Sequence, residues 1–145
     1  MRNVKGTVLW YSRAVVDDTG QYGTMLKNYY WKRPALPPLM PYIDKKAPKK
    51  PKNVEVVKMS DGNMVLCWEA PKGKKWNDEV RKFVVYKFEN DEKIDLNDAS
   101  KIVTITSNKM LKLPYVNGKT KYTYVVTAVD RMSNESSGVK MKVKL

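Results

Sequence analysis

One run near the C-terminal end constrains the fold of this 145-residue chain more than any other feature. From Tyr122 to Val129, β-branched and aromatic residues occupy both sets of alternating positions, and the run stops at Asp130 in a polar loop. A strand that is apolar on both faces is typically central, with neighbouring strands on either side. The preceding Asn117-Gly118 pair predicts a turn, because both residues tolerate positive φ. The run therefore predicts the central strand of a β-sandwich.

The rest of the region 51–145 divides into short apolar runs separated by turn residues. The other expected strands are residues 54–59, 64–70, 80–89, 102–106, 110–113 and 139–145. With the central strand, this pattern predicts an all-β, seven-stranded immunoglobulin-like sandwich. The residues predicted to form its structural core are Leu66, Trp68, Tyr122, Tyr124 and Val126.

Residues 1–32 have a different pattern. An apolar run at 4–12 predicts a strand, and apolar residues at helical spacing predict an amphipathic helix over about 18–31, capped by Asp17-Asp18-Thr19. One strand and one helix cannot bury each other, and a buried strand needs partners on both edges. The segment is therefore interpreted as the strand-and-helix remnant of a larger domain.

Residues 33–50 separate the two regions, and most of the chain's eight prolines lie between Arg33 and Pro51. A ligand for an SH3-type domain is one interpretation of such a segment. The spacing argues against it, because Arg33 is followed directly by Pro34. A semi-rigid linker is the better interpretation, and its apolar residues predict that it packs along a surface.

The net charge of +13 is spread along the chain. Residues 1–50 contain 10 Lys and Arg against 3 Asp and Glu, and residues 51–145 contain 18 against 12. Such a diffuse excess is typical of a solvated surface, and no nucleic-acid-binding motif accompanies it, so no nucleic-acid partner is expected. Weak, salt-sensitive retention on heparin would agree with this interpretation.

Histidine is absent and Cys67 is the single cysteine. Ser-His, Cys-His and His-ligated metal chemistry are therefore excluded, as is an internal disulfide bond. We expect no cofactor, no metal site and no catalytic residue in this chain. Its first residues do not form a signal peptide, and no apolar run approaches the length of a membrane span.

Four motifs in the second region carry a family resemblance. They are Leu66-x-Trp68-x-x-Pro71, Phe83-Val84-Val85-Tyr86-Lys87, the run from Tyr122 to Asp130, and Ser133-Asn134-Glu135-Ser136. From about residue 47 to 145 the chain resembles a fibronectin type III domain, of the variety attached to bacterial secreted glycoside-active enzymes. The resemblance implies that Trp68 lies between the two sheets, and that Tyr122 is a corner tyrosine bonding to the backbone near Val116.

The first 45 residues carry a second resemblance, whose last motif continues to Pro48. The motifs are Gly6-Thr7-Val8-Leu9-Trp10-Tyr11-Ser12, Tyr29-Tyr30, the passage from Pro34 to Pro41, and Asp44-Lys45-Lys46-Ala47-Pro48. They resemble the C-terminal end of a bacterial glycosyl-hydrolase-like family 10 domain, a (β/α)8 barrel whose catalytic acids come from earlier strands. The resemblance implies a longer parent enzyme that is extracellular, periplasmic or at the cell surface, with its own catalytic domain as the partner of this module.

Three aromatic residues are candidates for sugar contacts. Trp10 and Tyr11 would lie at the substrate-facing rim of a barrel strand in the parent, although packing against neighbouring strands is the simpler interpretation. Trp76, in a basic loop, is a candidate carbohydrate platform, or else a loop aromatic folded over the edge of the sandwich. Cys67 is interpreted as unreactive.

The acidic candidates are interpreted as structural. Asp78-Glu79 and Asp91-Glu92 are adjacent loop residues, whereas a glycosidase pair needs two carboxyl groups facing one cleft. Surface charge is therefore the interpretation for both pairs. Asp130 follows the central strand and is predicted to cap a turn rather than to bind a metal.

Three functions remain open. The first is a non-catalytic accessory or spacer module of a glycoside hydrolase, the second is a carbohydrate-binding module that could bind a polysaccharide, and the third is a protein-interaction or adhesion domain. The first is favoured because the sequence has no open row of aromatic residues and because residues 1–32 cannot form a barrel alone.

Overall fold

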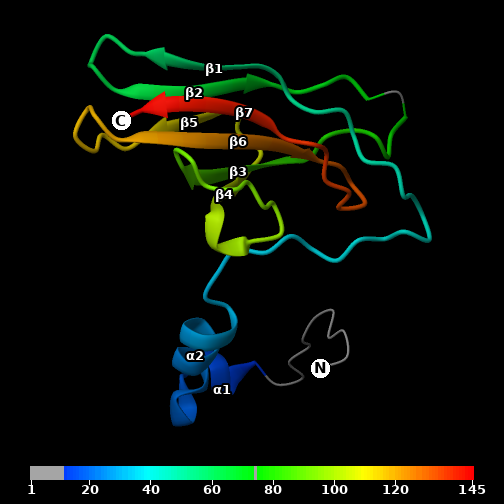
Figure 1. Cartoon of the computed structure of the whole chain (residues 1–145). Coiled ribbons are helices and arrows are strands. Elements are labelled where there is room, and N and C mark those ends of the chain that lie inside the picture. Colours follow the sequence, from blue (N-terminus) through cyan, green and yellow to red (C-terminus); the bar gives the residue numbers. More distant parts are fainter. Residues whose placement is uncertain (1–11, 74) are drawn as a thin grey trace. The chain divides into compact units, whose positions relative to one another are not determined.

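The computed structural model describes residues 12–73 and 75–145, which belong to two compact units, one ending at Pro38 and the other spanning Leu39–Leu145. The second unit is a sandwich of two antiparallel sheets (Figure 1). The three-stranded sheet has the order β1-β2-β5 and the four-stranded sheet the order β4-β3-β6-β7. The strands are β1 (Lys52–Lys58), β2 (Met64–Glu69), β3 (Lys82–Glu89), β4 (Ile102–Thr106), β5 (Met110–Leu113), β6 (Lys121–Val129) and β7 (Val139–Lys144). The predicted seven-stranded all-β sandwich is confirmed.

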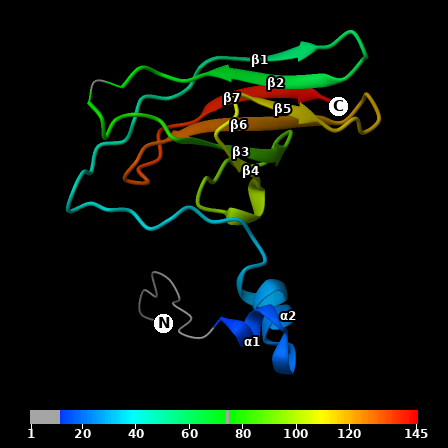
Figure 2. The same cartoon turned by 180° about the vertical axis from the view of Figure 1, so that it is seen from behind.

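The two layers remain distinct when the molecule is turned around (Figure 2). β1 begins at one end of the sandwich, and β7 ends beside Leu145 at the other end. Between the sheets lies one apolar core, in which Leu66, Val126 and Ala128 are fully buried. Trp68 is 3% exposed, and its ring meets that of Phe83 edge to face, with 5.7 Å between centroids.

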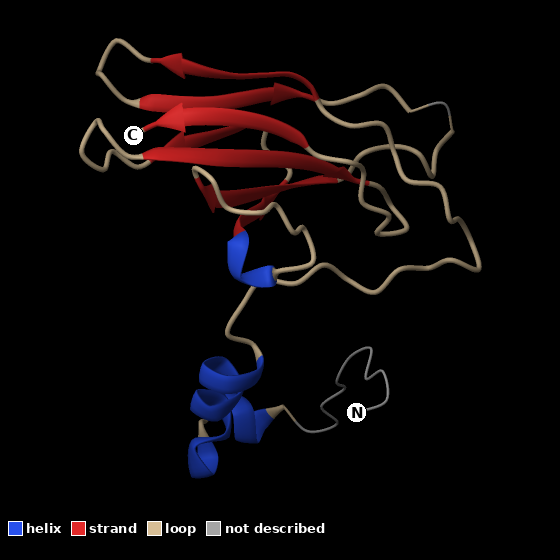
Figure 3. Cartoon of the chain, viewed as in Figure 1, coloured by secondary structure: helices blue, strands red, loops and turns tan. Residues whose placement is uncertain are grey.

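β6 is the central strand, as its sequence predicts. It pairs with β3 on one side and with β7 on the other. Its second face is also buried: Val125 and Thr127 on that face lie close to Gly138, and so does Leu96 from the connection between β3 and β4. This connection contains the short helix η3 (Ala99–Lys101), drawn with the other helices in Figure 3. A Cβ atom at Gly138 would overlap Val125 Cγ1, so this position accepts no side chain without displacement.

An ion pair fastens the connection between β3 and β4. The Lys101 ammonium contacts the Glu92 carboxylate, and the Glu89 backbone N–H donates to Glu92 Oε2 at 3.0 Å. The hydrogen bond from Lys101, followed by that from Glu89, lowers the pKa of Glu92 from its ordinary value. Because the folded-state pKa is lowered, this carboxylate stabilises the fold above the unfolded-state pKa, and the contribution is lost as the pH falls through the folded-state value.

Lys101→Gln is therefore expected to raise the pKa of Glu92 toward its ordinary value, because the largest cause of the shift is removed. A carbon-13 NMR titration of the Glu92 carboxyl group measures this directly. Lys93→Gln, which removes an exposed lysine from the same connection, is the matched control and should leave the pKa unchanged. An unchanged Glu92 pKa in the Lys101 variant would contradict the assignment.

The turn before β6 confirms the prediction made from Asn117-Gly118. Gly118 has a φ of 69°, and the Asn117 side-chain oxygen accepts hydrogen bonds from the backbone N–H groups of Lys119 and Thr120, both at 2.8 Å. The predicted corner bond of Tyr122 is wrong, since its hydroxyl makes no hydrogen bond near Val116 within the described chain. The Asn117 side chain holds this turn instead, and the Tyr122 ring lies under the Lys87 ammonium at 3.7 Å.

The first unit differs from the predicted single helix. It contains short helical segments: α1 (Arg13–Val16), η1 (Thr19–Gln21), α2 (Tyr22–Met25) and η2 (Leu26–Tyr30), the last a π-helix. Positive φ angles at Asp18, Gly20 and Gln21 break the helix before α2. Asp18 does not cap a helix that starts beside it, because the residue before α2 is Gln21; its carboxylate instead accepts hydrogen bonds from the backbone N–H and the hydroxyl of Thr24 within α2. The predicted strand at 4–12 lies outside the described residues, Ser12 excepted.

The aromatic residues of this unit are exposed. Tyr29 and Tyr30 are 79% and 74% exposed, and Tyr22 and Trp31 are more than half exposed. None of the helices in the described residues has the length and apolar character needed to cross a bilayer.

Candidate functional site

Trp76 lies in the loop between β2 and β3, at the end of the sandwich where β1 begins. Its side chain is 64% exposed, and the Arg131 guanidinium from the β6–β7 loop lies 5.8 Å from its ring centroid. Arg131 is held in turn by Glu79, to which it donates a hydrogen bond of 3.0 Å, and Glu79 also pairs with Arg81 at 3.4 Å. The arrangement presents an aromatic face bordered by a cation, which is one way to stack a sugar ring or a flat apolar group.

Asp44 connects the Pro-rich segment to the β2–β3 loop and to the β6–β7 loop. Its carboxylate accepts a hydrogen bond from the Asn77 side chain at 2.6 Å, and its backbone oxygen accepts one from the Asn134 side chain at 3.4 Å. The Met40 backbone N–H donates to Met132 O at 3.3 Å. The second half of the Pro-rich segment is thus attached to the loops of the sandwich, although Tyr42 remains 82% exposed.

Asp130 confirms its predicted role as a turn cap. It is 4% exposed, and its carboxylate accepts hydrogen bonds from the backbone N–H groups of Met132 and Asn134 at 2.8 and 2.9 Å. A third hydrogen bond comes from the Asn134 side chain at 3.1 Å. Ser133 takes a φ of 65° within this loop, so the carboxylate stabilises a conformation that non-glycine residues rarely adopt.

A carboxylate that sequence reasoning missed lies on the outer side of the four-stranded sheet. Glu135 Oε1 accepts hydrogen bonds from the Tyr86 hydroxyl at 2.7 Å and from the Thr127 hydroxyl at 2.6 Å. Burial, with a smaller effect of the hydrogen bond to Glu135, raises the pKa of Tyr86. Burial also raises the pKa of Tyr124 to about 12. Both tyrosines therefore remain neutral at physiological pH. The hydrogen bonds from Tyr86 and Thr127 to Glu135 hold the β6–β7 loop against the four-stranded sheet.

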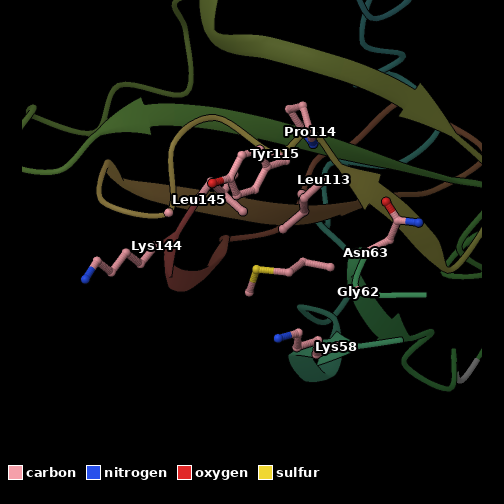
Figure 4. Close-up of a pocket in the computed structure, with 10 residues that line it drawn as sticks. Lys58, Gly62, Asn63, Leu113, Pro114, Tyr115, Lys144 and Leu145 are labelled. Carbon is pink, nitrogen blue, oxygen red and sulfur yellow. The ribbon is translucent and has the colours of Figure 1, made fainter. Parts of the chain in front are cut away.

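A pocket of about 310 Å³ opens at the other end of the sandwich (Figure 4). Leu113, Pro114 and Leu145 contribute apolar surface, and Tyr115 stands beside them with 81% of its side chain exposed. The residues that line the pocket are Lys58, Gly62, Asn63, Met64, Leu113, Pro114, Tyr115, Gly118, Lys144 and Leu145. The β1–β2 turn and the β5–β6 loop, which contribute to this pocket, lie at the opposite end of the sandwich from the β2–β3 loop, which contains Trp76, so the pocket and Trp76 do not form one site. This pocket was not identified from the sequence. The feature that could have indicated it is Tyr115, an aromatic residue directly after Pro114 in a loop.

The remaining predicted site residues fall in three groups. Trp10 and Tyr11 lie outside the described residues, so their suggested role stays a prediction. The loop carboxylates do not face a common cleft: Glu79 pairs with arginines and Glu92 with a lysine. No cluster of acidic or cysteine side chains suited to a metal ion occurs within residues 12–73 and 75–145, where Cys67 is a half-buried free thiol.

Comparison with solved structures decides the fold. A structure described as FN3tt mut superposes with a TM-score of 0.50 over 68% of this chain and 97% of its own length, at 18% identity. The sandwich has the fibronectin type III fold. The kinase region of twitchin from C. elegans, whose description includes a segment Fn31, superposes with a TM-score of 0.51 over 69% of this chain and 17% of its own, at 13% identity. At such identities the likeness concerns the fold alone.

The fibronectin type III domain and the residues before it also resemble a curated protein in sequence. The chain is 34% identical over 119 residues to the glycosyl hydrolase YngK of Bacillus subtilis (strain 168), a match that covers 82% of this chain. The chain spans only 23% of the length of that relative. No protein-family model matches the chain.

Proposed function

We propose that this chain is a non-catalytic accessory module, a spacer or support, from the C-terminal part of a longer secreted bacterial glycoside hydrolase. One observation carries the proposal. The match to the glycosyl hydrolase extends over 119 residues of this chain, whereas the region 51–145 contains only 95, so at least 24 matched residues precede Pro51. The similarity therefore joins the Pro-rich segment to the fibronectin type III domain, as expected for the junction between a catalytic domain and its appended module.

Two features of the structure support this role. The exposed aromatic side chains of the first unit, Tyr29 and Tyr30 among them, are apolar surface of the kind that a larger domain would cover. The acidic side chains that could serve glycoside hydrolysis, Glu79 and Glu92, are held in ion pairs with neighbouring cations. Hydrolysis needs one carboxyl group free to donate a proton and a second one across the scissile bond.

The decisive test lies upstream of this chain. The coding sequence that precedes the Met1 codon is expected to encode, in the same frame, a (β/α)8 barrel with its own pair of carboxylates. The purified chain is expected to release no reducing sugar from neutral or acidic polysaccharides. An upstream region without such a frame would contradict the proposal, as would sugar release by this chain that Glu79→Gln or Glu92→Gln abolishes.

A second candidate function is carbohydrate binding through Trp76, favoured by the 64% exposure of its side chain. The spacer proposal expects tryptophan fluorescence to show no saturation on titration with neutral oligosaccharides. Saturation at sub-millimolar ligand that Trp76→Ala removes, and that the control Trp31→Ala retains, would assign the binding role instead. Trp31 is the matched control because it is also an exposed tryptophan, at 51%.

A further inference from the structure

Strand pairing places a lysine of β6 beside three lysines of β7. β7 alternates between the core and the solvent, so Val143 is buried whereas Lys140, Lys142 and Lys144 are exposed. The register of the sheet places Lys121 of β6 directly opposite Lys144. We call these four residues, Lys121, Lys140, Lys142 and Lys144, the β7 lysine patch.

No acidic side chain within the described residues forms an ion pair with the β7 lysine patch. Glu89 of β3 pairs with Tyr122 of β6, a core residue, and therefore lies on the inner face of the sheet. Asn90, which lines the same hollow as three of these lysines, donates a hydrogen bond from its side chain to Asp91 Oδ1 at 2.8 Å. Because the lysines of the patch form no ion pair within the described residues, the patch has a local excess of positive charge.

Protection of a sheet edge explains only part of this arrangement. Lysines on an edge strand prevent pairing with another chain, and β7 is an edge strand. Lys121, however, lies on β6, which is paired on both sides. Like charges directly opposite each other on a sheet are destabilising, so placing Lys121 against Lys144 has a cost that edge protection does not require.

The patch is hollowed, and it adjoins the pocket described above. Asn90, Lys121, Lys142, Val143 and Lys144 line a hollow of about 310 Å³. Lys144 also lines the pocket that holds Tyr115, and Figure 4 shows its ammonium group pointing away from the apolar centre of that pocket. The two hollows therefore meet at Lys144, with an exposed aromatic ring on one side and a group of cations on the other.

We propose that the β7 lysine patch and the Tyr115 pocket together bind an acidic polysaccharide, a chain of sugars that carry carboxylates. Side chains two positions apart on a strand are separated by roughly 6.7 Å, so the cations from Lys140 to Lys144 extend over about 13 Å and match a repeating anion better than a single small one. The Tyr115 ring offers a flat apolar face to a sugar ring. This inference rests on the proposed role in a glycoside hydrolase.

The composition of the patch favours a polysaccharide over a nucleic acid. Proteins that bind single-stranded nucleic acids combine cations with several aromatic side chains on which successive bases stack, and often with arginine. The β7 lysine patch contains no arginine and is bordered by the single exposed ring of Tyr115.

Calorimetric titration of the intact chain with an oligogalacturonate tests the proposal. We expect saturable binding that weakens as sodium chloride is raised, and no binding of a neutral galactan oligosaccharide. The triple variant Lys121→Gln, Lys142→Gln, Lys144→Gln is expected to bind at least about tenfold more weakly, because three charge pairs are lost. The control Lys50→Gln, Lys75→Gln, Lys109→Gln has the same net charge, removes three exposed lysines elsewhere, and should change affinity by less than about threefold.

Tyr115→Ala is expected to weaken binding of the oligogalacturonate by about tenfold or more, since one stacking contact is removed. A heteronuclear NMR titration of the unaltered chain provides a measurement that requires no variant: the amide signals of Lys121, Lys142 and Lys144 should shift most.

Several results would overturn the proposal. They are absence of binding, equal losses in the two triple variants, unchanged affinity in Tyr115→Ala, or equally tight binding of single-stranded DNA with the same dependence on the patch. None of these results bears on the accessory role, which depends on the upstream barrel and on the absence of hydrolysis by this chain.

Discussion

Trp68→Ala is expected to destabilise the fibronectin type III domain by about 3–5 kcal/mol. The side chain is 3% exposed and lies between the sheets against Phe83, so its removal leaves a cavity that strands on both sides cannot fill. A domain of this size is stable by only about 5–15 kcal/mol, so the variant loses a large fraction of its free energy of unfolding. Urea unfolding followed by circular dichroism measures the loss.

Two other substitutions make the Trp68 result specific. Trp76→Ala removes a tryptophan that is 64% exposed and should change stability by less than about 0.5 kcal/mol. Trp68→Phe should cost less than the alanine variant, because the ring is largely kept and the buried indole N–H, which has no hydrogen-bond partner within the described residues, is removed. A Trp68→Ala variant with an unchanged urea midpoint would refute the placement of this residue in the core.

Asp130→Ala is expected to cost about 3 kcal/mol. Its carboxylate accepts hydrogen bonds from the buried backbone N–H groups of Met132 and Asn134, and the alanine variant leaves both without that acceptor. Hydrogen bonds to charged groups contribute roughly 1.5–3 kcal/mol each, and the remodelled loop will recover part of the loss through water.

The controls for Asp130 separate the hydrogen bonds from the charge. Asp130→Asn keeps one oxygen that can accept from the two backbone N–H groups, so its cost should be smaller than that of the alanine variant. Asp91→Ala removes an exposed carboxylate and should change the free energy of unfolding by less than about 0.5 kcal/mol. A loss in Asp130→Ala no greater than that in Asp91→Ala would show that the loop does not depend on this carboxylate.

The strands could be predicted closely because their apolar periodicity is local. The expected bounds of β4 and β5 agree with the structure, and β6 is buried on both faces as its two apolar sets require. The helix predicted over 18–31 starts too early: the backbone is helical from Tyr22 to Tyr30, but Asp18, Gly20 and Gln21 before it adopt positive φ, which residue spacing does not reveal.

The features relevant to function were harder to predict because they depend on strand register. Lys121 and Lys144 are 23 positions apart and become neighbours only through the pairing of β6 with β7, so the charge looked diffuse. The hydrogen bond between Tyr86 and Glu135 joins residues 49 positions apart, and neither position has a local signal. Trp76 could be identified from its basic loop, and its neighbour Arg131 could not.

The opposite placement of the start of β1 and the end of β7 has a mechanical consequence. Tension applied through the two ends of the sandwich runs lengthwise along β1 and β7, parallel to the strands. The hydrogen bonds to β2 and β6 are then loaded together in shear instead of being opened one after another from an end. Rupture requires many of these bonds to fail at once, so the sandwich is expected to resist such tension with little lengthening until it unfolds as a whole.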